Sequence, residues 1–282
     1  MPKKGFSAIL IVILIVVLAA AVLGGIYYYS QIYQPKSYAR DIISFFENLE
    51  KDMQTSQNQI LKNNKDYPSA IKLLEDQQAF LQNKKDELDS FNPPRKMRQL
   101  HQDFSKAFEL LIFANLEAPK IVNFISKANE LYEILKPKDE PKNETVGVFV
   151  QFWDSRIAQA KVVASELFQD KPPKADQFQF DKLKSTWQEV KEGYDAALNY
   201  LKRQDPNMLA SNVSEDNIPS EEKEKIKKVD KLDDLLSMLE GITRIDANEF
   251  IKFDFTAGIA GEELNQLLPK IEEGINELKQ KY

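Results

Sequence analysis

The sequence predicts an all-α fold, in which an N-terminal transmembrane helix is followed by an antiparallel helical bundle. No charged residue stands between Lys4 and Lys36, and most of that stretch is apolar. Beyond it, apolar residues recur three and four positions apart, which is typical of amphipathic helices. Glycine is scarce, with 9 residues, and most of the 13 prolines separate the periodic stretches, as expected of residues that interrupt helices.

The apolar segment at residues 6–29 is long enough to cross a bilayer. Ile9 to Leu18 is an unbroken run of Ile, Leu and Val, which favours insertion into lipid. A helix over residues 6–29 extends about 36 Å, against about 30 Å for the hydrocarbon core. We therefore expect a single-pass signal anchor in the cell membrane, with the lipid bilayer as its partner.

The charges beside this segment predict its orientation. Lys3 and Lys4 favour a cytoplasmic tail at residues 1–5, because basic flanks stay inside. Lys36 and Arg40 partly oppose this bias, but the very short tail is easily retained. We expect a cytoplasmic N-terminus and an extracytoplasmic C-terminal domain.

A cleaved signal peptide is an alternative for the same segment. Ala19, Ala20 and Ala21 offer the small residues of a cleavage site. The apolar run continues past them into tyrosines, which is long for a signal peptide. Both interpretations export the same domain.

A third interpretation comes from the leader Lys3-Lys4-Gly5-Phe6 and the apolar helix after it. This leader resembles that of type IV prepilins, in which a peptidase cuts between the glycine and the phenylalanine. The resemblance covers about residues 1–30 and implies a pilin-like assembly component. Pilins usually carry a glutamate at the fifth position after the cut, where this chain has Leu10, and the helical periodicity replaces the sheet that pilins have.

Composition excludes several classes of protein. The net charge is −6 over the 282 residues, and a mildly acidic, well-mixed surface predicts no nucleic-acid partner and no attraction to anionic lipid headgroups. The chain has no cysteine, which excludes disulfides, thiolate metal sites and a cysteine nucleophile. The exported domain must then be stabilised by apolar packing.

Residues 30–136 are predicted to form a first helical subdomain, followed by a polar linker at 137–144 and a second helical subdomain at 145–282. Pro119 is expected to open or kink a helix in the first, and Pro269 to kink or start one in the second. The predicted stripes are Ile42, Phe46, Leu49, Met53 and Ile60; Ile71, Leu74, Leu81 and Leu88; Met97, Leu100, Phe104, Phe108 and Leu111; Ile121, Ile125, Ala128, Leu131 and Leu135; Phe149, Trp153, Ile157, Ala160, Ala164 and Leu167; Phe180, Leu183, Trp187, Val190, Tyr194, Ala197 and Leu201; Ile226, Val229, Leu232, Leu236 and Leu239; and Leu264, Leu268, Ile271, Ile275, Leu278 and Tyr282.

Three local signals refine these elements. Ser220 is expected to be the N-cap of a helix that ends near Gly241. A polar linker at about 204–220 precedes this helix. Ile251, Phe253 and Phe255 alternate with charged residues, which is a strand period, and Val146, Val148 and Val150 are candidate partners. Since two strands alone are marginally stable, we expect an irregular extended segment there.

The sequence also contains an internal echo. Leu88–Pro94 and Leu167–Pro173 both end in Pro-Pro, are 79 residues apart, and are each followed by a basic residue and an amphipathic stretch. The pattern predicts two helical hairpins with a Pro-Pro corner. Duplication and convergence both explain it.

No residue is predicted to be catalytic, to bind a cofactor or to bind a metal. His101 is the sole histidine and is expected to be solvated or to flank a helix. The adjacent acidic pairs Asp233-Asp234, Glu262-Glu263 and Glu272-Glu273 point about 100° apart on a helix, so they are expected on solvated faces. The acidic stretch 211–222 lacks the glycine turn of a calcium loop. Trp153, Trp187 and Tyr194 are expected in the core.

Two functional hypotheses follow. The first is a non-enzymatic interaction or structural module at the cell envelope, which binds an envelope protein or associates with itself. The second is an extracytoplasmic sensor or carrier, in which the bundle holds a small ligand. A closed interior favours the first, and a pocket of several hundred Å3 favours the second.

Overall fold

The computed structural model describes residues 33–57, 63, 65–137, 139, 141, 144–250 and 252–282. This part of the chain is helical, which confirms the all-α part of the predicted fold, and its β-type pairing is a single isolated bridge between Thr145 and Leu209. The predicted anchor at 6–29 lies outside the described residues. Among the residues that are described, no helix has both the length and the apolar character needed to cross a membrane.

The chain divides into two compact units. Unit 1 contains the described residues up to 57 together with Asp76–Asn115 and Thr256–Tyr282, and unit 2 contains the described residues from 63 to 75 and Leu116–Phe255. This division differs from the predicted boundary at 137–144. Both units use part of α4 (Arg98–Leu135), which continues through Pro119, so the alternative in which Pro119 opens a new helix is wrong.

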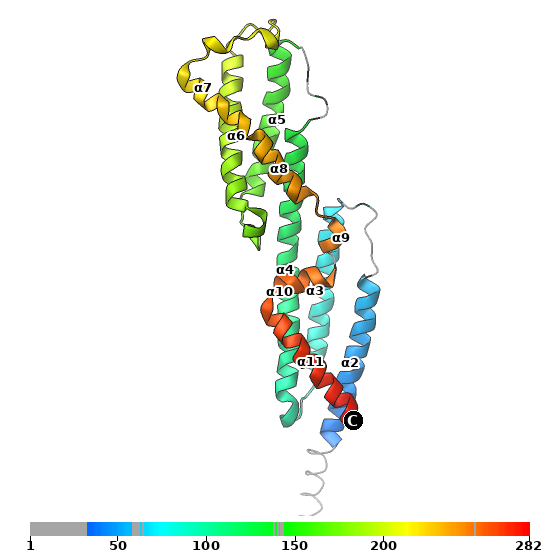
Figure 1. Ribbon diagram of the computed structural model, residues 1–282. Helices are drawn as coiled ribbons and strands as arrows, with labels where there is room; N and C mark the ends of the chain where they lie inside the picture. The colour runs from blue at the N-terminus through cyan, green and yellow to red at the C-terminus, as the bar shows by residue number, and fades with distance from the viewer. Residues whose placement is uncertain are drawn as a thin grey trace, which may run out of the picture. The chain divides into compact units, whose positions relative to one another are not determined.

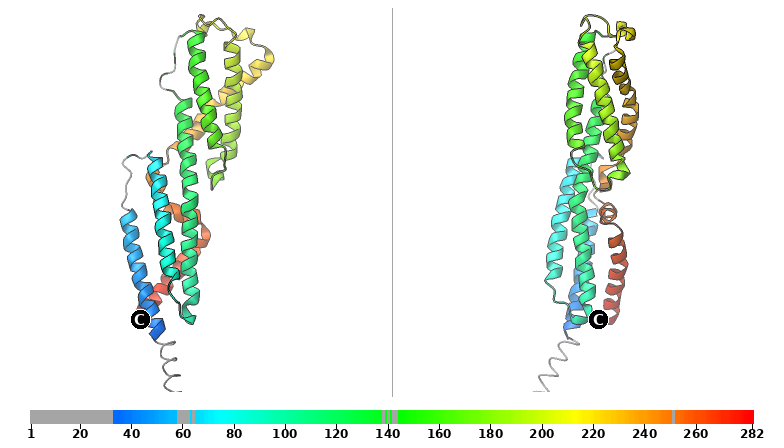
Figure 2. Two further views of the ribbon diagram at one scale, coloured as in Figure 1. Left: turned by 180° about the vertical axis from the view of Figure 1, so that it is seen from behind. Right: turned by 90° about the vertical axis from the view of Figure 1, so that its left-hand side faces the viewer.

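Unit 1 is built around three neighbouring helices, α2 (Gln34–Gln57), the later part of α3 (Tyr67–Asp89) and the first half of α4. A short 3-10 helix, η2 (Arg95–Met97), leads into α4. The last helix, α11 (Glu262–Lys281), packs across α2 in both Figure 1 and Figure 2. Pro269 lies inside α11 and does not mark its start.

An aromatic cluster forms much of the core of unit 1. Phe45 contacts Phe91 and Phe108 with ring centroids 5.9 and 6.0 Å apart, and Phe46 contacts Phe104 at 4.5 Å. Phe104 is fully buried. Because these rings come from α2, from the corner after α3 and from α4, the cluster joins all three.

Unit 2 contains the second half of α4, α5 (Val146–Leu167) and α6 (Phe180–Leu201). The chain then returns across α6 through α7 (Ser220–Ile226), the 3-10 helix η6 (Lys227–Lys231) and α8 (Leu232–Thr243), as Figures 1 and 2 show. The remaining elements of unit 2 are η3 (Ala175–Phe178), η4 (Ala210–Asn212), η5 (Glu215–Asn217) and α9 (Ala247–Phe250), and α10 (Phe253–Ala260) contributes residues to both units.

Ion pairs on the surface of unit 2 connect its helices. Lys127 of α4 pairs with Glu166 of α5 at 2.6 Å, Lys202 pairs with Asp154 of α5 at 2.7 Å, and Lys228 of η6 pairs with Glu192 of α6 at 2.7 Å. Exposed pairs of this kind contribute little each. The apolar stripes therefore carry most of the stability.

Both Pro-Pro corners turn the chain between two helices, as predicted. Positions 79 residues apart also share burial: Phe104 and Leu183 are 0% exposed, and Phe108 and Trp187 are 4% and 3% exposed. The corners differ in detail, because Lys174 adopts a left-handed conformation (φ 56°), whereas Arg95 opens η2. The two hairpins therefore share the pattern of buried positions in the helix after the corner, and not the conformation of the corner itself.

Three local predictions are wrong. Pro219 is the N-cap of α7, so Ser220 is the first helical residue and caps nothing with its side chain. The single helix predicted from Ser220 is divided into α7, η6 and α8, although α8 ends at Thr243, close to the predicted end near Gly241. Residues 253–260 form α10 and Val146–Leu167 forms α5, because an alternation over five residues does not distinguish a strand from a short helix.

Candidate functional site

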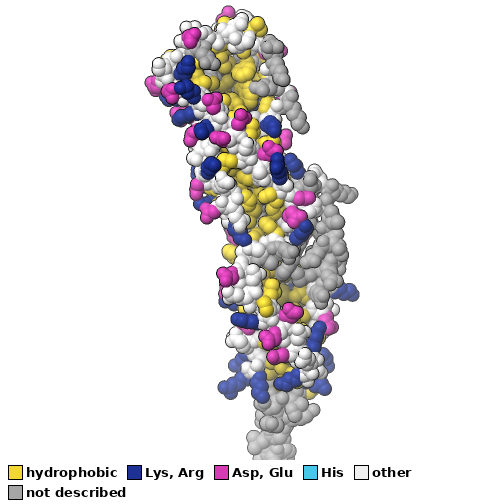
Figure 3. Space-filling model, viewed as in Figure 1, with side chains coloured by type: hydrophobic (Ala, Val, Ile, Leu, Met, Phe, Trp, Pro, Cys, Tyr) yellow, Lys and Arg dark blue, Asp and Glu magenta, His cyan; other side chains and the backbone are white. Residues whose placement is uncertain are grey.

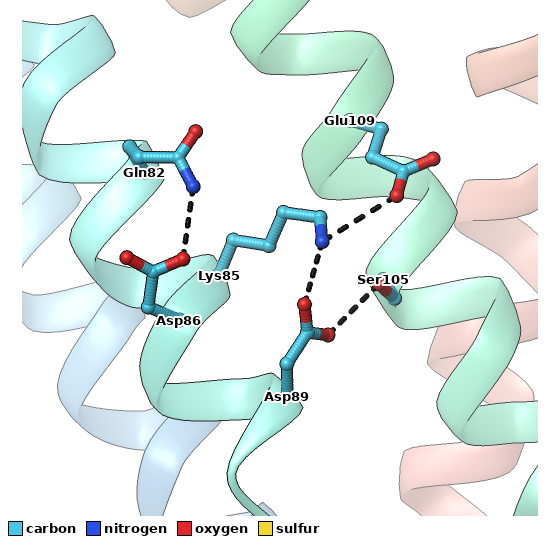
Figure 4. Close-up of polar contacts among 6 residues, drawn as sticks. All are labelled: Gln82, Lys85, Asp86, Asp89, Ser105 and Glu109. Carbon is cyan, nitrogen blue, oxygen red and sulfur yellow. Dashed lines mark hydrogen bonds and ion pairs between the residues drawn. The ribbon is translucent and has the colours of Figure 1, made fainter.

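A polar network joins α3 to α4 in unit 1 (Figure 4). Nζ of Lys85 lies 2.6 Å from Oδ2 of Asp89 and 3.4 Å from Oε1 of Glu109. Oγ of Ser105 donates a hydrogen bond of 2.9 Å to Oδ1 of Asp89. The side chain of Lys85 is only 16% exposed, so its charge is held where both carboxylates can neutralise it.

The charges of this network stabilise one another. Partial burial opposes ionisation of Asp89, but the hydrogen bonds from Lys85 and Ser105 outweigh it, so the pKa of Asp89 lies below its usual value. The hydrogen bond to Asp89 raises the pKa of Lys85. Both groups are charged at neutral pH, and the network acts as an electrostatic link between two helices.

His101 lies on α4, one turn before Ser105. Its Nδ1 is 3.1 Å from the hydroxyl of Tyr38, and its ring is half-buried. The prediction of a solvated histidine is therefore wrong in part, because α2 covers one side of the ring through Tyr38. Burial lowers the pKa of His101, against a smaller opposing effect from the charge of Asp89.

Ser105, Asp89 and His101 lie near one another but do not form a catalytic triad. In a triad the serine hydroxyl bonds to the imidazole, and the carboxylate orients that imidazole. Here the serine bonds to the carboxylate and the imidazole bonds to Tyr38. The imidazole does not contact Ser105, and the Asp89 carboxylate that does is already paired with Lys85, so the arrangement fits a structural link.

Acidification is expected to destabilise unit 1 through His101. The folded pKa is below the unfolded value of about 6.5, so the unfolded chain binds the proton first. The contribution of His101 to the stability of unit 1 is fully present above the unfolded pKa. It decreases as the pH falls from there toward the folded pKa. Urea unfolding of wild type and His101→Gln at about pH 7.5 and about pH 5.5 measures this: the wild type should lose more stability than the variant, and an equal loss in both contradicts the assignment.

The acidic pairs offer no metal site. Asp233-Asp234, Glu262-Glu263 and Glu272-Glu273 are all exposed, and Glu263 pairs with Lys106. Over the described ranges, no group of three or more His, Asp or Glu side chains is close enough to hold a metal ion.

An open apolar groove lies in unit 2, between α5, α6 and the returning segment α7–η6. It has a volume of about 520 Å3, and Trp153, Tyr194, Leu198, Ile226 and Val229 are among its lining residues. The rings of Trp153 and Tyr194 are 5.1 Å apart at its base. Figure 3 shows hydrophobic side chains on the surface of this unit. The groove suits a small, mainly apolar molecule.

Sequence reasoning correctly predicted buried positions for the aromatics but missed the groove. Trp153, Trp187 and Tyr194 are 4%, 3% and 8% exposed, as expected for core residues. Two of them also line the groove, whose other wall comes from residues 218–230. No local pattern indicates that this later segment returns onto α6.

Comparison with known proteins gives no relative: no family model, no curated protein and no solved structure matches this chain.

Proposed function

We propose that the chain is a membrane-anchored helical-bundle protein that acts outside the cytoplasm as a non-enzymatic interaction or structural module of the cell envelope. The observation that carries this proposal is the uncharged segment 6–29, which precedes a domain whose described residues form an all-α fold. The hydrogen bonds of Ser105, Asp89 and His101 support a structural role for these three residues. An envelope protein or a second copy of the chain is the proposed partner.

Membrane anchoring is tested by fractionating cells that express the full chain. We expect the protein in the membrane fraction after alkaline carbonate washing and its distal part to be cleaved by protease added outside. Mass spectrometry of the mature N-terminus separates the alternatives: an intact start supports the anchor, a cut after Gly5 supports a pilin-like component, and a cut near Ala21 supports a signal peptide. Release by carbonate contradicts the anchor.

The groove in unit 2 favours a second candidate, an extracytoplasmic small-ligand sensor or carrier. Its volume and apolar lining fit the pocket expected of that class. Trp153 lines the groove, and the chain has 2 tryptophans. With Trp187 replaced by phenylalanine, the fluorescence of Trp153 alone reports occupancy.

Filling the groove is expected to weaken ligand binding strongly without unfolding unit 2. Ala197 lines the groove, whereas its neighbour Ala196 does not, since adjacent helical residues point about 100° apart. Titration of Ala197→Phe with an apolar fluorescent probe should show at least tenfold weaker binding than Ala196→Phe, the matched control. Equal affinity in the two variants places the probe elsewhere and contradicts the sensor candidate.

A further inference from the structure

Three segments that are far apart in the sequence lie at the same end of unit 1. These are the start of α2, the corner between α3 and α4, and the end of α11, as all views in Figures 1 and 2 agree. Contacts within the unit support this: Tyr38 bonds to His101, and Lys279 pairs with Glu47 at 3.3 Å. We call residues 33–40, 90–98 and 278–282 the basal end.

The basal end has a charge unlike the rest of the chain. Its three segments contain seven Lys or Arg and no Asp or Glu, although the whole chain has a net charge of −6. All seven are exposed, and Figure 3 shows dark blue side chains gathered there. They are Lys36, Arg40, Arg95, Lys96, Arg98, Lys279 and Lys281.

Most of these charges are not neutralised within the protein. Arg40 lies 3.6 Å from Asp41, and Lys279 pairs with Glu47. The other five make no ion pair with any described residue, and Lys281 instead lies over the ring of Tyr282. Together these exposed cations create a positive potential at the basal end, which attracts anions.

Aromatic residues and a hollow accompany the charges. Tyr33 and Tyr282 are 55% and 39% exposed, although large rings are usually covered in a bundle. They line an open hollow of about 530 Å3 together with Lys36, Arg40 and Glu47, the last of which pairs with Lys279. Exposed tyrosines beside basic residues are typical of surfaces at the level of lipid headgroups.

We propose that the basal end binds the anionic phospholipid headgroups of the membrane that holds the anchor. This inference rests on the proposed function, because the predicted anchor ends at Tyr29, only four residues before Tyr33. The chain therefore leaves the bilayer at the basal end. Cations held within a Debye length of the surface, about 8 Å, are attracted to its negative charge, and the unit rests on the membrane by three segments.

A probe on the corner between α3 and α4 tests the contact. The full-length chain has no cysteine, so Asn92→Cys, at an exposed position, carries a single fluorophore. The labelled chain is inserted into nanodiscs of phosphatidylcholine with or without phosphatidylglycerol, each containing a lipid with a nitroxide on its headgroup. We expect at least twofold stronger quenching in the anionic discs, and loss of that difference at about 0.5 M salt.

Two variants with the same net charge distinguish the effect of the basal cations on quenching from the effect of the net charge of the chain. Lys36→Gln, Arg95→Gln, Lys96→Gln and Arg98→Gln combined should abolish the extra quenching. The control combines Lys72→Gln, Lys182→Gln, Lys191→Gln and Lys270→Gln, which change the net charge equally outside the three segments, and should retain it. Equal quenching in both kinds of disc, or equal loss in both variants, overturns the lipid contact while the anchor stands. Failure of the chain to enter the discs overturns the anchor and this inference together.

Discussion

Replacing Phe104 with alanine is expected to destabilise unit 1 by about 3–5 kcal/mol, the usual cost of deleting a buried phenylalanine ring. Phe104 is 0% exposed and packs on Phe46 at 4.5 Å. No small movement of α2 can fill the space, because Phe45 is already held by Phe91 and Phe108. Urea unfolding followed by circular dichroism measures the loss, and hydrogen exchange in α2 and the first half of α4 assigns it to unit 1.

Phe113→Ala is the matched control for this prediction. Phe113 lies on the same helix but is 55% exposed, so its removal should change stability by less than about 1 kcal/mol. If the losses of stability in Phe104→Ala and Phe113→Ala differ by less than about 1 kcal/mol, the aromatic cluster does not form the core of unit 1.

Alanine at Gly193 is expected to destabilise unit 2 by about 1–3 kcal/mol, the cost of overpacking, although alanine favours helices. A Cβ atom at this position would lie 2.7 Å from the backbone nitrogen of Val229 and 3.0 Å from the carbonyl carbon of Lys228. Backbone cannot rotate away as a side chain can, so η6 must move off α6. Tryptophan fluorescence reports this directly, because both tryptophans lie in α5 and α6 of unit 2.

Gly241→Ala is the matched control, and we expect it to stabilise unit 2, whereas Gly193→Ala destabilises it. Gly241 lies in α8, and a Cβ there would meet nothing within 4 Å, so alanine should stabilise the helix by about 0.5–1 kcal/mol. If Gly193→Ala and Gly241→Ala change the free energy of unfolding in the same direction, the close approach of η6 to α6 is contradicted.

The regular helices of this fold could be predicted from sequence because their signals are local. The stripe from Phe180 to Leu201 begins and ends at the first and last residues of α6, and the stripe from Phe149 to Leu167 lies within α5. Each of these signals depends on residues three or four positions apart. The prediction was wrong for short segments such as 253–260, because so few residues do not define a period.

The candidate sites could not be predicted because they depend on the path of the chain. The groove needs α7 and η6 to return onto α6, and the basal end combines residues near 36, 95 and 281. The composition averages these cations with acidic residues elsewhere, which is why it indicates no attraction to anionic lipid. Single contacts such as Tyr38 with His101 are likewise 63 positions apart.

The division of the chain between the units has a consequence for biosynthesis. The described residues of unit 1 come from 33–57, 76–115 and 256–282, whereas those of unit 2 come from the sequence between these segments. As a ribosome extends the polypeptide, every residue of unit 2 emerges before α11, whose Leu264, Leu267 and Ile271 become buried in unit 1. The unit whose synthesis starts first is therefore the one completed last, and its apolar surface stays open to chaperones until then.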